Sequence, residues 1–320
     1  MRVGAIDCGT NSIRLLIADV GRDGSWGDGT TLTDVVRLNT IVRLGQGVDA
    51  TGWLAQDALE RTFAATEDYA GLLGEHHVDA VRFVATSATR DAGNRHVFVD
   101  GIQRRLGVEP EVISGQEEAA LSFAGASLVA PAADAEDRVL VVDLGGGSTE
   151  FVLGSSEGIV AARSVDVGCV RMTERHLGSN PPSQTQQAAV LTDVDRAIDK
   201  VLQTVPLAQA RSLVGVAGSV TTITARALGL ETYDAERLNG SVLSAEDVGR
   251  ACRELTGMTR EQRAALPYMH PGRVDVIGGG ALIWRRIVER VMEATSGRVN
   301  SVTTSEHDIL DGIALSLTDR

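Results

Sequence analysis

The sequence contains little cysteine. Cys8, Cys169 and Cys252 are the only three, they lie far apart, and no CxxC pair or Cys/His cluster accompanies them. Small disulfide-stapled folds and structural zinc sites both need clustered cysteines. Both classes are therefore excluded, and we expect the three thiols to be reduced.

Aromatic residues and positive charge are also scarce. Aromatics make up 3% of the chain, the net charge is −13, and Lys200 is the only lysine. Nucleic-acid-binding proteins usually carry a basic face with stacking rings, so this composition argues against that class. A polyanionic substrate would have to be bound by a local group of arginines and backbone N–H donors that overcomes an unfavourable global field.

Long apolar runs are absent as well. No run approaches the length of about 18 residues that a membrane-spanning helix needs. No charged-then-apolar leader precedes the first expected strand, so we expect a soluble, unprocessed cytoplasmic protein. With 43% apolar residues, the 320-residue chain has enough material for the cores of two domains.

The opening stretch "VGAIDCGTNSIRLLIAD" has the pattern of a strand, a tight turn and a second strand. The later stretch "LVVDLGGGSTEFVL" repeats this pattern. Aligned on their acidic residues, the two stretches share three positions, Asp7 with Asp143, Gly9 with Gly145 and Ser12 with Ser148, while Arg14 aligns with Glu150. Each copy predicts a β-hairpin with an acidic residue at its mouth.

Two further echoes follow in the same order. "VRFVATSATR" aligns with "LVGVAGSVTT", and "EVISGQEEA" aligns with "DVIGGGALI", which pairs Val112 with Val276. The growing offset between the copies predicts an insertion within 229–270. Three collinear echoes indicate a duplication, so we expect an α/β protein of two domains that share a strand order and flank a cleft.

The expected boundary lies in the Ala-, Pro- and acid-rich stretch "SLVAPAADAED", residues 127–137. This gives a first domain over 1–128 and a second over 129–304, with a final helix over 305–320 that packs back on the first domain. Apolar spacing predicts further helices over 54–73, 184–202 and 281–292. Ser244 and Ser305 are the expected caps of two helices.

The stretch "DLGGGSTE" carries the strongest single signal for ligand binding. Three glycines, Gly145 to Gly147, follow a buried strand and let the backbone expose several N–H groups, a nest that suits phosphate oxygens. Ser148 adds a hydroxyl donor, while Asp143 and Glu150 could hold a hard divalent cation. The alternative is a tight glycine hairpin with two solvated carboxylates. The similar loop around Gly9 favours phosphate binding, with both loops facing one cleft.

The stretch "VATSATRDAGN" ends another expected strand. Thr86 and Ser87 place hydroxyls at its tip, and Arg90 follows with a guanidinium that can hold phosphate through two hydrogen bonds. The alternative is a Ser/Thr helix cap followed by a surface arginine.

The stretch "VISGQEEAALSFAGA" places Glu117 and Glu118 in the first turn of an apolar helix. Acidic residues there are ordinary partners of the helix dipole. Adjacent helical residues point about 100° apart, so only one of the two faces the cleft well. A carboxylate beside bound phosphate can orient or deprotonate water. The spacing leaves open which glutamate takes that role.

A competing signature lies in the opening stretch. Cys8 and Arg14 have the C-x5-R spacing of cysteine-dependent phosphatases, in which a loop holds phosphate around a thiolate. Residues 13–18 read as a strand and not as a helix that would lower the pKa of the thiol. No histidine precedes the cysteine, and the repeat places Leu144 at its position. We therefore favour a small strand residue at Cys8, and expect a Cys8→Ser protein to remain active.

Together these stretches resemble the exopolyphosphatase/guanosine pentaphosphate phosphatase family, within the actin, sugar kinase and Hsp70-like superfamily. The matching blocks run in the family's order from Ala5 to Ile283: "AIDCGTNSIRLLIA", "ATSATRDAGN", "VISGQEEA", "VVDLGGGSTEFV", "VDVGCVRMTE", "GVAGSVTT" and "GGGALI". The resemblance implies two duplicated ribonuclease H-like (actin-like ATPase) domains. It also implies hydrolysis of a terminal phosphoanhydride with Mg²⁺ or another divalent cation.

The resemblance also assigns roles to residues. It makes Glu118 the catalytic base and associates Asp143, Glu150 and Asp7 with metal or water. The implied phosphate contacts are Gly9, Thr10, Asn11, Ser12, Arg90, Gly145, Gly146, Gly147 and Ser148. We expect Gly278 to Gly280 to be structural here, although "IGGGALI" resembles the adenosine-binding turn of the superfamily.

The expected substrate is inorganic polyphosphate, from which orthophosphate is released. The alternative is guanosine pentaphosphate 5′-phosphohydrolase activity, with guanosine pentaphosphate or tetraphosphate as substrate or inhibitor. Arg171, Thr173 and Arg273 could serve either substrate. An ATP-dependent kinase and a non-catalytic polyphosphate sensor are less favoured. A homodimer is expected from the family, and no nucleic acid or membrane partner.

The chain resembles the short, two-domain form of the family. Longer relatives add a C-terminal helical region with metal-binding His/Asp residues. The only His-Asp dipeptide here is His307-Asp308, which we expect to be an exposed pair within the last helix.

Overall fold

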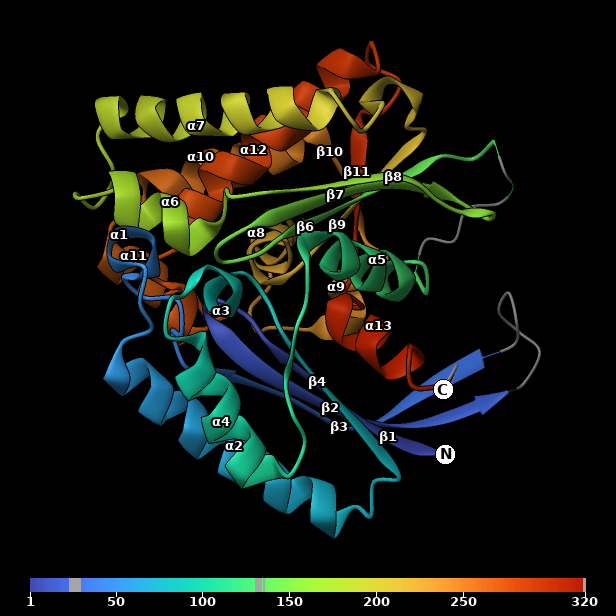
Figure 1. The fold of residues 1–320 in the computed structure, drawn as a ribbon. Helices are drawn as coiled ribbons and strands as arrows, with labels where there is room; N and C mark the ends of the chain where they lie inside the picture. The colour runs from blue at the N-terminus through green and yellow to red at the C-terminus, as the bar shows by residue number, and fades with distance from the viewer. Residues whose placement is uncertain (23–29, 130–133, 135, 319–320) are drawn as a thin grey trace. The chain divides into compact units, whose positions relative to one another are not determined.

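The computed structural model describes residues 1–22, 30–129, 134 and 136–318. The chain divides into two compact units (Figure 1): Met1–Leu128 together with Ile309–Arg320, and Val129–Asp308. The expected boundary stretch, 127–137, lies partly outside the described residues. No helix in the described part of the chain is long and apolar enough to cross a membrane.

The first unit contains a five-stranded sheet in the order β3-β2-β1-β4-β5. Its strands are β1 (Arg2–Cys8), β2 (Ser12–Arg22), β3 (Thr30–Ile41), β4 (Ala80–Ala85) and β5 (Glu111–Val112). β2 runs antiparallel to both β1 and β3, whereas β4 runs parallel to β1 and β5. Alternate residues of β1 enter two different core clusters, which explains why this strand is apolar nearly throughout.

Helices cover both faces of this sheet. They are α1 (Val48–Thr51), α2 (Gln56–Glu75), α3 (Ser87–Asp91), α4 (Arg95–Leu106), α5 (Gly115–Ala126) and α13 (Ile309–Leu315). Residues of α2 and α4 pack with Ile6 on one face, and residues of α5 and α13 pack with Ala5 on the other. A Cβ on Gly312 of α13 would overlap the backbone of Leu121 in α5, so only glycine permits this contact.

The last helix begins later than expected. α13 starts at Ile309, and Ser305 does not cap it, because its hydroxyl donates to the carbonyl of His307. Asp308 is buried and precedes the helix. The expectation of an exposed helical His307-Asp308 pair was therefore wrong.

The second unit contains a six-stranded sheet in the order β10-β11-β9-β6-β7-β8. Its strands are β6 (Val139–Leu144), β7 (Thr149–Ser155), β8 (Gly158–Val165), β9 (Ser212–Val216), β10 (Val242–Ser244) and β11 (Ser301–Thr304). Without β10, this order repeats that of the first unit, with β6, β7, β8, β9 and β11 in the places of β1 to β5. The repeated order confirms the duplicated α/β fold.

The helices of the second unit are α6 (Cys169–His176), α7 (Gln184–Leu202), α8 (Gly218–Leu228), α9 (Ala235–Leu238), α10 (Ala245–Gly257), α11 (Arg260–Ala264) and α12 (Ile277–Ala294); Leu207–Gln209 and Pro271–Arg273 form short 3₁₀ turns. α7 has the expected bounds, and Ser244 caps α10 by accepting a hydrogen bond from the N–H of Asp247. The segment from α9 to α11 fills the expected insertion.

One of the three internal sequence alignments, "EVISGQEEA" with "DVIGGGALI", was wrong. By its place in the sheet order, β5 corresponds to β11, whereas Val276 lies directly before α12. Gly278 to Gly280 are buried in the first turn of that helix, and a Cβ on Gly280 would crowd the side chain of Ser219. These glycines allow close packing of a helix, which a sequence pattern does not distinguish from a glycine turn.

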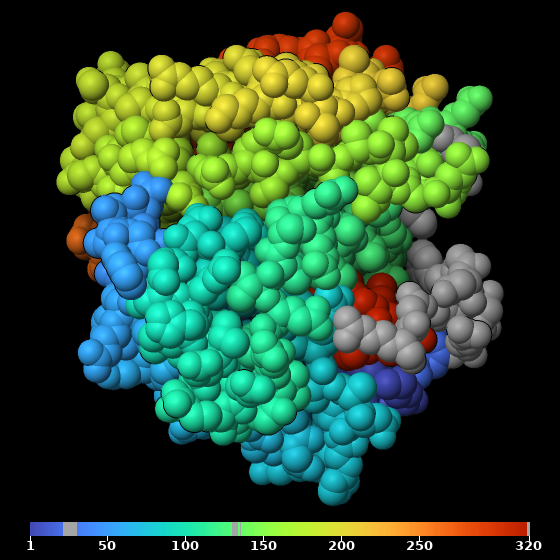
Figure 2. Space-filling model, in the orientation of Figure 1, coloured from blue at the N-terminus to red at the C-terminus, as the bar shows by residue number. Residues whose placement is uncertain are grey.

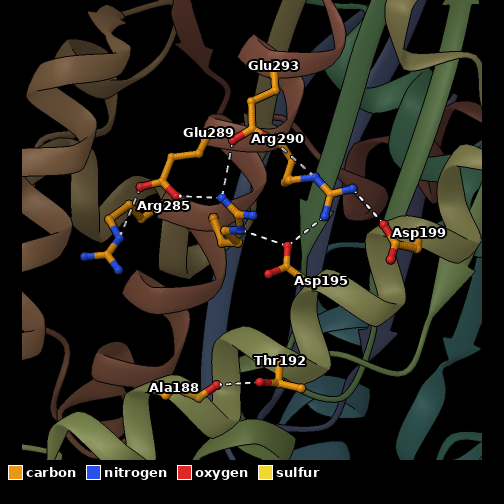
Figure 3. A network of polar contacts seen from close by, with 9 residues as sticks. Ala188, Thr192, Asp195, Asp199, Arg285, Glu289, Arg290 and Glu293 are labelled. Atoms are coloured by element: carbon orange, nitrogen blue, oxygen red, sulfur yellow. Dashed lines mark hydrogen bonds and ion pairs between the residues drawn. The ribbon is translucent and has the colours of Figure 1, made fainter.

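An ion-pair network joins α7 to α12 (Figure 3). Arg290 donates from Nη1 to Asp195 Oδ1 and from Nη2 to Asp199 Oδ1, both at 2.7 Å, and Arg286 Nε donates to Asp195 Oδ1 at 2.8 Å. Burial alone would raise the pKa of Asp195, but the two arginines outweigh it and hold this pKa below its ordinary value. Asp195 is therefore the central anion of the network.

We expect Asp195→Asn to lower the free energy of unfolding by about 1 kcal/mol at pH 7, a modest loss because the carboxylate is partly exposed. A lowered pKa in the folded protein contributes stability above the ordinary aspartate pKa of about 3.9, and this contribution is lost as the pH falls. Urea unfolding should thus separate the two proteins above about pH 4 and no longer separate them at lower pH. A difference that persists in acid would contradict this account.

Candidate phosphate-binding site

The two hairpins share the same turn at the level of hydrogen bonds. The N–H of Gly9 donates to the carbonyl of Ser12 at 2.9 Å, and the N–H of Gly145 donates to the carbonyl of Ser148 at 3.1 Å. The duplication thus extends to the bond that closes each loop. Because the N–H groups of Gly9 and Gly145 are engaged within the turns, the backbone N–H groups that remain as expected phosphate donors are those of residues 10–12 and 146–148.

In the first unit, the segment after β3 supports the loop. The N–H groups of Val42 and Arg43 donate to the carbonyl of Asn11 at 3.1 and 2.9 Å, and the N–H of Gly45 donates to the carbonyl of Thr10 at 2.8 Å. Sequence reasoning missed this segment. Its signal is the short run "RLGQG", in which Arg43 has a φ of 52°.

In the second unit, α6 takes the same supporting role. The N–H groups of Cys169 and Val170 donate to the carbonyls of Gly145 and Gly146 at 3.0 and 2.8 Å. Gly168 lies so close to the loop that a Cβ there would overlap the backbone of Gly146. The loop therefore caps the N-terminus of α6.

These supports determine which way the loop N–H groups point. In a trans peptide the carbonyl and the next N–H point in opposite directions. The carbonyls of Thr10 and Asn11 face the segment after β3, and the carbonyl of Gly146 faces α6. The N–H groups of Asn11, Ser12 and Gly147 therefore point away from these supports, as phosphate donors must.

The tip of β4 joins the first loop. Thr86 donates its N–H to the carbonyl of Cys8 at 3.1 Å, and the hydroxyl oxygens of Thr10 and Ser87 lie 2.9 Å apart. Thr10 and Ser87 are both buried. The hydroxyls expected at this strand end thus fix the loop to its neighbouring strand, and Arg90 follows in α3.

The structure distinguishes Glu117 from Glu118, between which the sequence left the choice of catalytic base open. Ser114 caps α5 by accepting from the N–H of Glu117. Glu117 is half exposed and its carboxylate pairs with Arg82 at 2.7 Å. Glu118 is buried and its Oε2 accepts from Nη1 of Arg90 at 3.0 Å. Only Glu118 therefore belongs to the chain of contacts that runs through Arg90 and the β4 tip to the first loop.

The carboxylates of the two hairpins differ in their charge partners. Asp7 lies opposite Arg14 in the β1–β2 register, and its Oδ2 accepts from Nε and Nη2 of Arg14 at 2.9 and 2.7 Å. Asp143 lies opposite Glu150 in the β6–β7 register, and both are buried. Directly opposed residues share a face of the sheet, so the second hairpin places two carboxylates together where the first has an ion pair.

This arrangement bears on the expected metal. The described residues hold no group of three or more His, Cys, Asp or Glu side chains that could bind a metal ion. Mg²⁺ in phosphate-transfer sites commonly uses only one or two carboxylates, with water and substrate phosphates as the remaining ligands. Asp143 and Glu150 fit that donor set, whereas an arginine already neutralises Asp7.

Three further candidate residues lie in the second unit. Arg171 Nε donates to the carbonyl of Gly147 at 2.7 Å, so it contacts the glycine loop. Thr173 packs against Gly279 of α12. Arg273 packs on Gly218 and donates to Thr222 Oγ1 at 3.3 Å, next to Ala217, whose φ of 72° is strained for a non-glycine residue.

The thiolate alternative was wrong. Cys8 is buried, and burial together with the charge of Asp7 raises the pKa of its thiol well above the ordinary value. Ser12 begins a strand and Arg14 pairs with Asp7. A thiolate at Cys8 would therefore be stabilised neither by a helix N-terminus nor by a free arginine.

We expect Cys8→Ser to keep its activity within about threefold of the wild-type protein, because the thiol stays protonated in the core. Iodoacetamide should likewise leave the folded wild-type enzyme active. Loss of activity in both experiments would restore the thiolate mechanism.

The model of the Ppx/GppA phosphatase family matches residues 22–318. The chain belongs to the Ppx/GppA phosphatase family. This membership confirms the resemblance drawn from the sequence blocks.

Individual Ppx/GppA relatives cover the whole chain. Exopolyphosphatase 2 of Mycobacterium tuberculosis is 52% identical over 99% of this chain and 98% of its own length. A solved structure of an exopolyphosphatase-like protein has a TM-score of 0.93 at 47% identity and covers 100% of this chain and 99% of that one. An exopolyphosphatase structure from Cytophaga hutchinsonii has a TM-score of 0.85 at 27% identity, covering 100% and 98%.

Proposed function

We propose that this protein is a metal-dependent exopolyphosphatase, which hydrolyses the terminal phosphoanhydride of inorganic polyphosphate and releases orthophosphate. The observation that carries the proposal is the pair of the buried Glu118 with the partly exposed Arg90, joined through the β4 tip to a loop whose N–H groups point outward. The relative named exopolyphosphatase 2, at 52% identity over nearly the full length, supports the same activity.

In the proposed reaction, outward-pointing loop N–H groups bind phosphate oxygens. Glu118 accepts a proton from a water molecule, or orients it, as the water oxygen bonds to the terminal phosphorus. The bridging P–O bond breaks, and the shortened chain leaves with the electron pair. Arg90 fixes the Glu118 carboxylate and faces the developing negative charge. Phosphoryl transfer depends mainly on positioning and electrostatic stabilisation of this kind.

A Mg²⁺ ion held by Asp143 and Glu150 would supply positive charge to the phosphate oxygens. Ser164 donates from Oγ to Glu150 Oε1 at 2.7 Å, and so fixes one of the two carboxylates. The remaining ligands would come from water and substrate.

We expect Asp143→Asn to raise the Mg²⁺ concentration for half-maximal activity at least about tenfold, because one of two anionic ligands is lost. Calorimetric titration with Mg²⁺ should show the same weakening without any turnover. Glu157→Gln, an exposed carboxylate after β7, is the matched control and should leave both readouts unchanged. An unaltered Mg²⁺ response in Asp143→Asn would remove this residue from the metal site.

Guanosine pentaphosphate is the second candidate substrate, since its 5′-terminal phosphoanhydride suits the same chemistry. Side-by-side kinetics with linear polyphosphate and guanosine pentaphosphate would separate the two. We expect the larger kcat/KM for polyphosphate. A larger value for guanosine pentaphosphate would make the nucleotide the substrate and leave the site assignment unchanged.

We further propose that the enzyme acts in the cytoplasm, as a homodimer. The chain has only three cysteines, all buried and free, which is typical of a reducing compartment. Light scattering of the purified protein would give the oligomeric state, and the activity proposed above does not depend on it.

A further inference from the structure

A groove of about 340 Å³ lies in the second unit, between the edge strand β8 and helices α6 and α7. α7 runs across the face of this unit that Figure 2 shows. Four cations and two carboxylates line the groove: Arg163, Arg175, Arg196, Lys200, Asp166 and Asp193. In a chain of net charge −13, this is a local excess of positive charge.

The groove's positive charge is only partly neutralised by protein. Asp193 Oδ2 accepts from His176 Nε2 at 2.8 Å and from Arg175 Nη1 at 3.2 Å, so this carboxylate is already engaged. Arg163 and Lys200 are exposed, and neither pairs with a carboxylate among the described residues. Two cations of the groove thus remain for an anionic ligand.

Basic residues of α6 lead from the glycine loop toward the groove. Arg171 contacts the loop at Gly147, and Arg175 lies one helical turn further on the same face of α6. From there the basic residues pass to α7, where Arg196 and Lys200 are four positions apart and share a face.

The other wall of the groove is tied to the same hairpin. Val167 lines the groove, and its carbonyl accepts from Thr149 Oγ1, next to the glycine loop. Phosphate bound at the loop therefore has basic side chains leading away from it within one unit.

We propose that this groove binds the distal phosphates of a linear polyphosphate chain whose terminal phosphate occupies the loop. The inference rests on the proposed function, because it assigns a binding site to the part of the polyphosphate chain that lies beyond the reacting end. A polyphosphate has a negative charge at every unit and no other recognition feature, so separated cations along a shallow groove are the chemistry that recognises it. A short substrate that ends at the loop would not reach Arg163 and Lys200.

The test compares two double variants that remove the same charge. Arg163→Gln with Lys200→Gln changes the groove, and Arg237→Gln with Arg253→Gln changes exposed arginines elsewhere in the second unit. For long-chain polyphosphate we expect the groove variant to raise KM about three- to thirtyfold, the loss of two exposed ion pairs, with kcat unchanged. Its KM for tripolyphosphate should not change, and the control variant should match the wild type with both substrates.

A binding measurement keeps the groove separate from catalysis. In a Glu118→Gln background, calorimetry with long-chain polyphosphate at several salt concentrations should show weaker binding and a smaller salt slope for the groove variant only. If the wild-type enzyme released no phosphate from polyphosphate, the proposed function would be wrong. The titration would still test whether the groove binds polyphosphate. Equal affinities in the groove variant and its parent, an equal loss in the control variant, or an equal rise in KM for tripolyphosphate would overturn the inference.

Discussion

Glu118→Gln lowers kcat for phosphate release by about 10² to 10⁴, the usual contribution of a positioned general base. The amide keeps the size of the side chain and can still lie beside Arg90, but it does not accept a proton from water. Because Glu118 acts on the reacting water and not on binding, KM should change little. Phosphate release under substrate saturation measures the effect.

Glu117→Gln is the matched control, since it makes the same chemical change one residue away. Glu117 is half exposed, and its partner Arg82 also pairs with Glu111, so the loss of the Glu117 charge should alter kcat by less than about twofold. If the two variants were equally active, or if Glu117→Gln were the slower enzyme, the base would be assigned wrongly.

Gly168→Ala lowers kcat/KM by about 10², the cost expected when catalytic groups move by about 1 Å. A Cβ at this position would overlap the carbonyl of Gly146 and the backbone nitrogen of Gly147, and neither belongs to a flexible side chain that could rotate away. The glycine loop must therefore shift, and its outward N–H groups shift with it. Steady-state kinetics with polyphosphate and with tripolyphosphate should show the same loss, because the loop binds the reacting phosphate of both.

The control for this change is Gly257→Ala at the end of α10, where an added Cβ meets no atom within 4 Å. It should leave activity unchanged. Urea unfolding is measured alongside, because overpacking at Gly168 also costs about 1–3 kcal/mol of stability. A Gly168→Ala enzyme that is folded and fully active would show that the loop position does not matter for catalysis.

The hairpins were predictable because their strands, turns and acidic residues all lie within one short stretch of sequence. Apolar alternation determines the strand pairing, and the turn glycines determine the loop. The repeat of "DCGTNS" in "DLGGGS" therefore predicted that the same hairpin occurs twice. The bounds of α7 were predictable for the same reason, since Ser183 and Gln186 form a local capping box.

Features that depend on partners distant in the chain were not predictable. Glu117 and Glu118 differ through Arg82 and Arg90, which lie about thirty residues earlier. The support of Thr10 by Gly45 and the start of α13 at Ile309 likewise come from tertiary contacts. The pairing of Val112 with Val276 failed because a glycine run fits both a turn and a tightly packed helix. The expected cleft between the two domains stays a prediction.

The most direct test of the account is hydrolysis of linear polyphosphate in ¹⁸O-labelled water with Mg²⁺, followed by mass analysis of the released orthophosphate. Attack of water on the terminal phosphorus predicts one ¹⁸O atom in each orthophosphate released from the long chain, and the same labelling at a far lower rate in Glu118→Gln. Orthophosphate without label, or no release of orthophosphate by the wild-type enzyme, would contradict the proposed reaction.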